Sequence, residues 1–151
     1  MSTNIDISRV HGLDLLKSYN LPRDKFMLMN SSWQAVLGIR ENGDLDVLVT
    51  PDILADFEKV VKKPVSIMKY VHWYIQPFGA TPEKIIKHHS VEIDGIKILS
   101  FGTYKKSLKI RMETGKIQPS AARLGKKSER DLSAIEHLVD DGTGYPIEFQ
   151  D

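Results

Sequence analysis

The chain has 151 residues, 41% of them hydrophobic, which is enough to bury one compact core, so we expect a single domain over residues 1–151. With 21 Lys and Arg against 20 Asp and Glu, the net charge of +1 excludes a bulk attraction to nucleic acid or anionic membranes. Cysteine is missing, which excludes disulfides and thiolate metal sites. No apolar run approaches the ~20 residues of a membrane helix, and residues 1–9 lack a signal-peptide core, so we expect a cytoplasmic protein with no membrane partner.

The first half of the chain predicts alternating helices and strands. Apolar residues at helical spacing predict a short amphipathic helix over residues 8–19. Residues 26–29 are apolar and bounded by polar residues, which favours a strand, and a brief helix over 33–37 is closed by Gly38. Residues 44–49 are rich in Val and Leu without strict alternation, as in a strand covered on both faces.

Two further helices are predicted by their start signals. Thr50-Pro51-Asp52 supplies an N-cap, a proline at the first helical position and an acid in the first turn, and Lys62-Lys63-Pro64 ends that helix. Thr81-Pro82-Glu83 starts another by the same logic. The segment 65–78 between them is apolar and aromatic, and is compatible with either a strand or a helix.

The last third predicts a hairpin followed by C-terminal helices. Residues 90–93 and 96–99 flank Asp94-Gly95, a favoured two-residue hairpin turn. A basic helix should run from Ser100 to about Met112, followed by a loop through Gly125. Ser128 and Asp131 have the spacing of a capping box, which predicts the start of a last helix with Leu132, Ile135, Leu138 and Val139 on its apolar face. The tail from about residue 140 looks loosely held.

Two aspartates mark a candidate site. Asp is disfavoured inside strands, yet Asp44 and Asp46 stand at the start of a predicted strand that is otherwise apolar. Residues i and i+2 of a strand point to the same face, so both carboxylates can converge on a hard cation such as Mg²⁺. The alternative is that Asp44 only flanks the turn at Asn42-Gly43 in solvent.

The pattern around these aspartates resembles the nucleotidyltransferase superfamily. A strand followed by Asn30-Ser31, a short helix, and a strand opening with Asp44-Leu45-Asp46 is similar to the family's strand, Gly-Ser or Gly-Gly, helix and Asp-x-Asp. The resemblance implies an α/β (α+β) fold with a mixed sheet flanked by helices. It also implies that Asp44 and Asp46 hold a catalytic Mg²⁺ and that Asn30 and Ser31 contact nucleotide phosphates. This chain has Asn30 where the family usually has glycine.

Weaker parts of the resemblance extend to the later strands and helices. Glu92 is placed where the family often carries a third carboxylate, which would deprotonate the acceptor; an exposed strand glutamate is the alternative. Lys109, and Lys127 at the head of Lys127-Ser128-Glu129-Arg130-Asp131-Leu132, look like the family's lysine and its Lys-Asp-x-x-Asp-Leu stretch, with Ser128 in place of the first aspartate. Both lysines are candidates for binding phosphate, or they belong to a solvated basic face.

Arg40 is a further candidate, because a guanidinium just before the acidic pair can clamp a phosphate through two hydrogen bonds. Its alternative is a simple salt bridge to Glu41 or Asp44.

The resemblance implies Mg²⁺-dependent transfer of a nucleoside monophosphate from a nucleoside triphosphate such as ATP to an acceptor, which can be a small molecule, a protein or a nucleic acid. Two other functions stay open. One is a non-catalytic protein of the same fold that binds a nucleotide or a partner protein. The other is a nucleic-acid-binding module that uses the basic region from Lys105 to Lys127.

Overall fold

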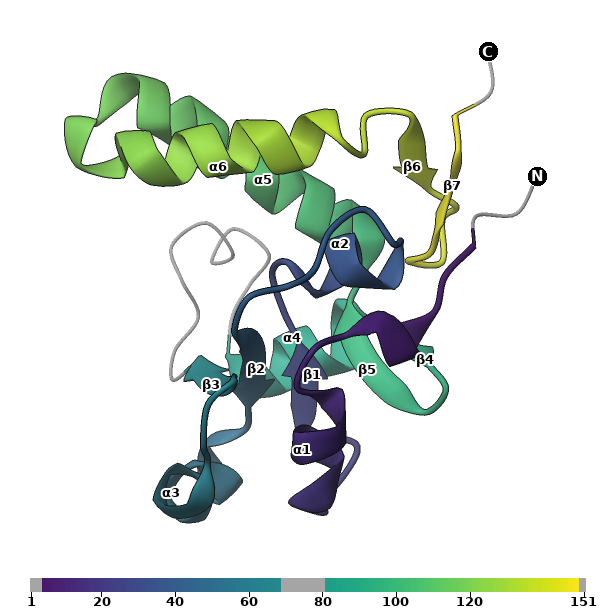
Figure 1. Ribbon diagram of the computed structural model, residues 1–151, viewed down its shortest axis with the longest axis vertical. Helices are drawn as coiled ribbons and strands as arrows, with labels where there is room; N and C mark the ends of the chain where they lie inside the picture. The colour runs from purple at the N-terminus through teal and green to yellow at the C-terminus, as the bar shows by residue number, and fades with distance from the viewer. Residues whose placement is uncertain (1–3, 69–80, 150–151) are drawn as a thin grey trace.

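A five-stranded mixed sheet forms the centre of the computed structural model, which describes residues 4–68 and 81–149 (Figure 1). The strands, in chain order, are β1 (Phe26–Leu28), β2 (Leu45–Val49), β3 (Val65–Met68), β4 (Ser90–Ile93) and β5 (Ile96–Leu99). Their order across the sheet is β3-β2-β1-β5-β4. The β1/β2 and β4/β5 pairs are antiparallel, whereas β1/β5 and β2/β3 are parallel. This confirms the predicted mixed α/β class.

The central strands are apolar because both faces of the sheet are covered. All three residues of β1 are buried, and so is every residue of β2 except Asp46, which is half-buried. At the turn between β4 and β5, Asp94 and Gly95 have φ angles of 50° and 78°. Two left-handed residues in succession are what a tight hairpin turn needs, so the predicted Asp-Gly hairpin is confirmed.

Short helices pack around the sheet. They are α1 (Leu13–Ser18), α2 (Ser32–Val36), α3 (Pro51–Val60) and α4 (Pro82–His88). The helix predicted over residues 8–19 is shorter, because Gly12 with φ of 88° separates a 3-10 turn at Ile7–Arg9 from α1. In Figure 1, α1 and α3 lie below the sheet, while α2 lies above it together with the C-terminal helices.

Two long helices form an antiparallel hairpin above the sheet, α5 (Phe101–Ile117) and α6 (Ala122–Ser133), joined by a 3-10 turn at Pro119–Ala121 (Figure 1). The loop predicted up to Gly125 is therefore wrong. Gly115 and Gly125 lie where the helices cross, and a Cβ built on either glycine would be 2.8 Å from the other's Cα. They permit close packing of two helices and do not break a helix.

The predicted capping box at Ser128 is also wrong. Ser128 lies inside α6 and is buried, and its hydroxyl donates to the Leu124 carbonyl at 2.8 Å. This bond from residue i to residue i−4 satisfies the hydroxyl of a serine in a helix interior. Ser128 and Asp131 therefore have the spacing of a capping box, but no helix begins at Ser128.

The C-terminal tail is tied to the fold and is not loose as predicted. It forms a two-stranded sheet of β6 (Leu138–Asp140) and β7 (Pro146–Glu148), so Leu138 and Val139 belong to a strand and not to the last helix. The Asp140 carboxylate accepts backbone N–H groups from Gly102 at 2.8 Å, Gly142 at 2.7 Å and Gly144 at 3.0 Å. The bond from Gly102 fastens the tail to the start of α5, and the bonds from Gly142 and Gly144 hold the turn between β6 and β7.

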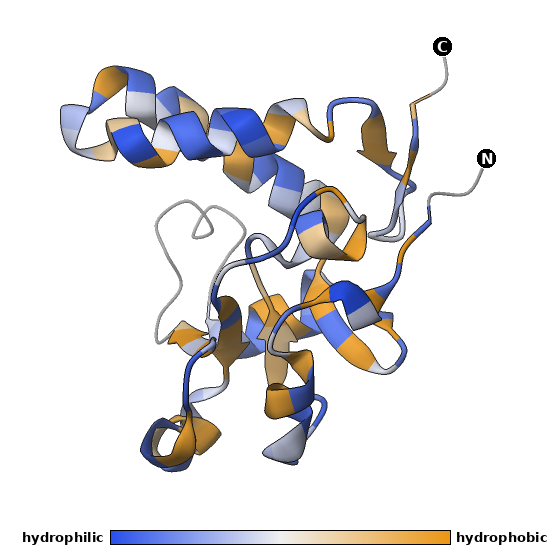
Figure 2. Cartoon of the chain, in the orientation of Figure 1, coloured by the Kyte–Doolittle hydropathy of each residue, from blue (hydrophilic) through white to orange (hydrophobic). Residues whose placement is uncertain are grey.

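One hydrophobic cluster extends through the sheet, α2 and the base of the C-terminal hairpin. Trp33 is fully buried at its centre, stacks edge-on against Phe101 with ring centroids 5.5 Å apart, and donates its indole N–H to the Leu99 carbonyl at 2.6 Å. Figure 2 shows apolar residues on the central strands and mostly polar residues along α5 and α6. Within the described ranges, no helix has the length and apolar character needed to span a membrane.

Candidate functional site

A cavity of about 530 Å³ lies between the sheet and the C-terminal hairpin. This volume is within the usual range for a small-molecule site. Residues from four separate parts of the chain line it: the loop after β1, the segment that leads into β2, α5 and α6. The lining residues are Asn30, Ser31, Arg40, Gly43, Asp44, Asp46, Tyr104, Arg111, Leu124, Lys127, Ser128, Arg130 and Asp131.

The antiparallel pairing of β1 and β2 brings the acidic pair to this cavity. Leu28 is opposite Val47, and the Met29 N–H donates to the Asp46 carbonyl at 3.0 Å, so the end of β1 lies beside the start of β2. Asp44 is exposed and Asp46 is half-buried, and both line the cavity. The two predicted aspartates therefore line one cavity, Asp46 from within β2 and Asp44 from the position just before it.

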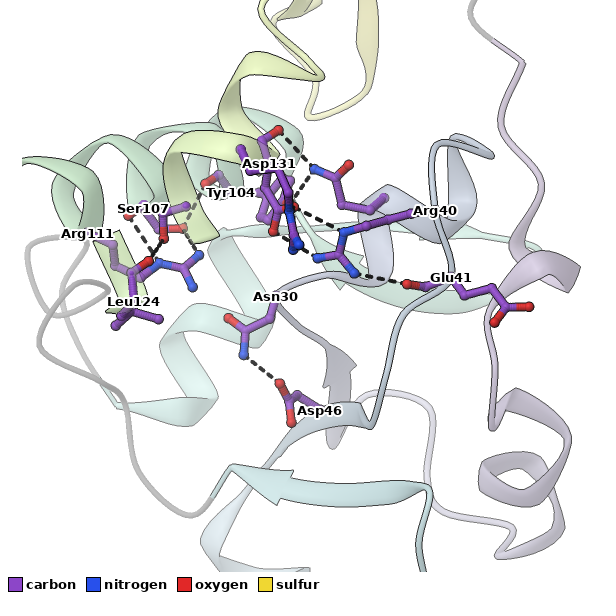
Figure 3. A network of polar contacts seen from close by, with 12 residues as sticks. Asn30, Arg40, Glu41, Asp46, Tyr104, Ser107, Arg111, Leu124 and Asp131 are labelled. Carbon is purple, nitrogen blue, oxygen red and sulfur yellow. Dashed lines mark hydrogen bonds and ion pairs between the residues drawn. The ribbon is translucent and has the colours of Figure 1, made fainter. Parts of the chain in front are cut away.

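Asn30 contacts Asp46 directly. Its side-chain Nδ2 donates to Oδ2 of Asp46 at 2.8 Å (Figure 3). Its φ of 53° lies in the left-handed region, which glycine occupies without strain and asparagine tolerates better than most residues. Asn30 thus adopts the backbone conformation that a glycine would allow there, and adds a hydrogen bond that orients one aspartate.

Arg40 lies in the cavity wall, but its partner was not predicted. Its Nε and Nη2 donate to the two carboxylate oxygens of Asp131 at 3.1 and 2.9 Å, and its Nη1 donates to the Glu41 carbonyl at 2.9 Å (Figure 3). The hydrogen bonds to Asp131 raise the pKa of Arg40 above its usual value. The guanidinium thus forms a bidentate pair that joins the loop before β2 to α6, with Asp131 in place of the alternative partners Glu41 and Asp44. Its role as a phosphate clamp stays a prediction.

A buried amide supports this pair from behind. Gln34 of α2 is fully buried, and its Nε2 donates to the Tyr104 hydroxyl at 2.8 Å and to the Asp131 carbonyl at 3.1 Å. Burial raises the pKa of Tyr104 to about 12, so this phenol stays neutral near pH 7. Gln34, Tyr104 and Asp131 therefore hold α2, α5 and α6 in one arrangement around the cavity.

The wall formed by the hairpin carries positive charge. Arg111 of α5 is buried and donates to the backbone and hydroxyl oxygens of Ser107 at 3.4 Å (Figure 3). Lys127 and Arg130 of α6 are exposed and line the same cavity. The cavity thus has carboxylates on the sheet side and cations on the hairpin side.

Two predicted site residues lie elsewhere. Glu92 is exposed on β4, 3.9 Å from Lys97, and three strand spacings separate β4 from β2, which is about 14 Å. Lys109 lies on α5 outside the cavity, where it borders a separate hollow with Lys105, Lys106 and Asp140 of β6. Glu92 is kept away from the acidic pair by the strand order, because β1 and β5 lie between β2 and β4.

Five contributors were missed by sequence reasoning: Gln34 behind the cavity wall, and Tyr104, Arg111, Arg130 and Asp131, the partner of Arg40, in the wall itself. Asp131 alone carried a signal, since the Asp-Leu of the Lys-Asp-x-x-Asp-Leu resemblance falls on Asp131-Leu132. Gln34 and Tyr104 are far apart in sequence and no local pattern joins them. Of the apolar and aromatic segment that was compatible with either a strand or a helix, residues 65–68 form β3, and residues 69–80 lie outside the described residues.

The residues present fit a Mg²⁺ ion that is shared with a phosphate ligand. Within residues 4–68 and 81–149, no three His, Asp or Glu side chains gather into a metal-binding group. Mg²⁺ is commonly held by one or two carboxylates together with substrate phosphates, and Asp44 and Asp46 supply that number. On β3, the neighbour of Asp46 across the ladder is Ser66, so that position contributes no third carboxylate.

Comparisons with known proteins give no independent identification. The chain matches no protein-family model, no curated protein and no solved structure. The resemblance to nucleotidyltransferases therefore rests on the sequence pattern around Asn30, Ser31, Asp44 and Asp46.

Proposed function

We propose that the protein is a Mg²⁺-dependent nucleotidyltransferase, which moves a nucleoside monophosphate from a nucleoside triphosphate to an acceptor hydroxyl. The observation that carries the proposal is the distribution of charge in the cavity. Asp44 and Asp46 stand on one side, and Arg111, Lys127 and Arg130 stand on the other. A nucleoside triphosphate with its cation needs both kinds of group within a few ångströms.

The cationic side suits the triphosphate. Lys127 and Arg130 are exposed and long, so their charged ends can follow a flexible phosphate chain. Arg111 is buried at 7% exposure and adds a fixed charge behind them. Asp131 pairs with both Arg40 and Arg130, so a single carboxylate lies among Arg40, Arg111, Lys127 and Arg130, and this side of the cavity keeps a net positive charge that attracts phosphate.

The acidic side suits the metal. Asp44 and Asp46 would hold Mg²⁺, which neutralises the charge that develops on the phosphates during transfer. Asn30 orients the Asp46 carboxylate through its 2.8 Å hydrogen bond. The Ser31 hydroxyl makes no side-chain cap bond to α2 and lines the same wall, so it is available to a phosphate oxygen.

The reaction is a substitution at the α-phosphorus. The acceptor oxygen forms a bond to that phosphorus, the bond from phosphorus to the pyrophosphate oxygen breaks, and pyrophosphate leaves with the electron pair. The acceptor proton passes to solvent at the open mouth of the cavity. Glu92 takes no part in this scheme, because it lies at the far edge strand.

The test is nucleotide binding by a variant without the acidic pair. Asp44→Asn with Asp46→Asn should lower the Mg²⁺-dependent affinity for an α,β-nonhydrolysable ATP analogue at least tenfold, measured by isothermal titration calorimetry. The matched control is Asp52→Asn with Asp56→Asn, the same charge change on α3 and away from the cavity lining. Equal affinity in all three proteins would contradict the metal role of Asp44 and Asp46.

A nucleotide-binding protein without transferase activity is the second candidate function. It is favoured by the number of carboxylates, since the described part of the cavity offers Asp44 and Asp46 to the metal, while Asp131 is paired with Arg40. Pyrophosphate release from the four nucleoside triphosphates, measured with small-molecule, protein and nucleic-acid acceptors, separates the two functions. Tight Mg²⁺-dependent binding with no release in any mixture would favour the second.

A further inference from the structure

Charge is distributed unevenly over this nearly neutral chain. The hairpin from residue 101 to residue 133 contains nine Lys and Arg against three Asp and Glu, a net charge of +6, so the remaining residues carry −5. Segregation of this size creates a local field that the overall charge of +1 conceals. The hairpin is therefore the part of the molecule that attracts a polyanion.

The fold places seven of these nine cations on two faces. On α6, Arg123, Lys127 and Arg130 follow a spacing of i, i+4 and i+7, which places them on one side of the helix, with Lys126 beside them. All four are exposed, whereas the α6 residues that pack against α5 are buried. On α5, Lys105, Lys106 and Lys109 border a separate hollow with Asp140.

The basic face of α6 begins at the cavity. Lys127 and Arg130 line the cavity, while Arg123 and Lys126 lie outside it on the same helix. From Arg123 to Arg130 the helix rises about 10 Å, a distance that a few consecutive nucleotides can follow. A strand whose phosphates lie along this face would thus have a neighbouring nucleotide at the mouth of the cavity.

We infer that the acceptor is a single-stranded nucleic acid, bound through its phosphates by the α6 face of Arg123, Lys126, Lys127 and Arg130, with one ribose hydroxyl directed into the cavity. The assignment of the hydroxyl as acceptor rests on the proposed function; the binding surface does not. The strand oxygen would bond to the α-phosphorus and pyrophosphate would leave, as in the general scheme. The phosphates of a nucleic-acid strand are regularly spaced, so they complement the row of Arg123, Lys127 and Arg130 better than an acidic peptide does, because the charges of a peptide are irregularly spaced.

Binding of a fluorescent 20-nucleotide RNA, measured by anisotropy without nucleotide or Mg²⁺, tests the surface. Arg123→Glu with Lys126→Glu should weaken binding at least tenfold and reduce the slope of log affinity against log salt by about 1.4, since each lost phosphate contact on a single strand removes ~0.7. The matched control is Lys106→Glu with Lys109→Glu on α5, the same change in charge on the other face, and should weaken binding less than threefold. Circular dichroism melting verifies that both variants fold.

Several results would overturn the inference. These are equal weakening by the two double variants, equal affinity for a duplex, equal competition by a glutamate peptide of the same charge, or no RNA binding by the unchanged protein at 100 mM salt. The double variant at Arg123 and Lys126 should keep its affinity for the ATP analogue, because both residues lie outside the cavity lining. Conversely, RNA binding by the unchanged protein, together with no Mg²⁺-dependent binding of the ATP analogue by that same protein, would retain the surface and reject the transferase.

Discussion

Asp131→Asn and Arg40→Met should destabilise the protein unequally, although each removes the same ion pair. Arg40 donates two hydrogen bonds to Asp131, at 3.1 and 2.9 Å. The Arg40 side chain is 32% exposed, but that of Asp131 only 11%. A stranded Arg40 regains water easily, whereas a stranded Asp131 carboxylate does not.

The magnitudes follow from this difference in exposure. A hydrogen bond to a charged group contributes ~1.5–3 kcal/mol when it is shielded from solvent. Since Arg40 is one-third exposed, we expect Asp131→Asn to cost about 1–2 kcal/mol. Arg40→Met leaves a nearly buried carboxylate, partly compensated by Arg130 at 3.3 Å, and should cost about 2–3 kcal/mol.

Urea unfolding of the two single variants and the double variant, followed by circular dichroism, measures these free energies. The double variant should cost less than the sum of the single ones by at least 0.5 kcal/mol or so, because both remove one interaction. Asp52→Asn, which removes the exposed partner of Lys25, is the control and should leave the midpoint unchanged within error. Additive costs, or a larger cost for Asp131→Asn than for Arg40→Met, would refute the reasoning from burial.

Three further variants test other parts of the structure. Ser66→Asp places a carboxylate beside Asp46 on the neighbouring strand. In the absence of nucleotide, its affinity for Mg²⁺, measured by calorimetry, should be at least tenfold higher than that of Ser66→Asn. No gain would mean that the side chain at position 66 does not reach the cavity. Gly125→Ala introduces a Cβ 2.8 Å from the facing helix backbone and should lower stability by about 1–3 kcal/mol, while Gly43→Ala, which meets nothing within 4 Å, should not; equal melting temperatures would contradict the close helix crossing. Tyr104 has a pKa raised to about 12 in the fold, so its contribution to stability is complete below pH 10 and is lost as pH rises from 10 to 12. Tyr104→Phe should remove up to ~3 kcal/mol of that alkaline loss, measured by urea unfolding at pH 9 to 12, and identical alkaline limbs in both proteins would be inconsistent with a buried phenol.

The local sequence was sufficient to predict the parts of the fold whose signals are local. Residues 26–29 are apolar throughout, and residues 45–49 are apolar except for Asp46, because both faces of their strands are covered. That pattern is visible without the structure. The Asp94-Gly95 turn follows from the conformational freedom of two residues. Asp44 and Asp46 were also found from a local signal, because Asp is disfavoured in strands and two of them stand at the start of an otherwise apolar segment.

Tertiary structure decided where local signals had two meanings. Gly115 and Gly125 suggest a loop by composition, but they are in fact the contact between two helices, and only the approach of α5 to α6 distinguishes the two cases. Glu92 looked like a third carboxylate by its order in the chain, yet the strand order β3-β2-β1-β5-β4 places it at the opposite edge from β3. Chain order does not determine sheet order, because a strand pairs with whichever neighbour buries its faces.

The sequence by itself thus determined the mixed α/β class, the acidic pair and the element that carries it. Only the tertiary structure decided what faces that pair. Arg111, Lys127 and Arg130 come from a hairpin more than 60 residues further along the chain, and Arg40 is turned toward Asp131 by a contact across 91 positions. The physical reason is that backbone propensity and apolar periodicity act over a few residues, whereas a binding cavity is formed by side chains whose proximity results from packing the whole core.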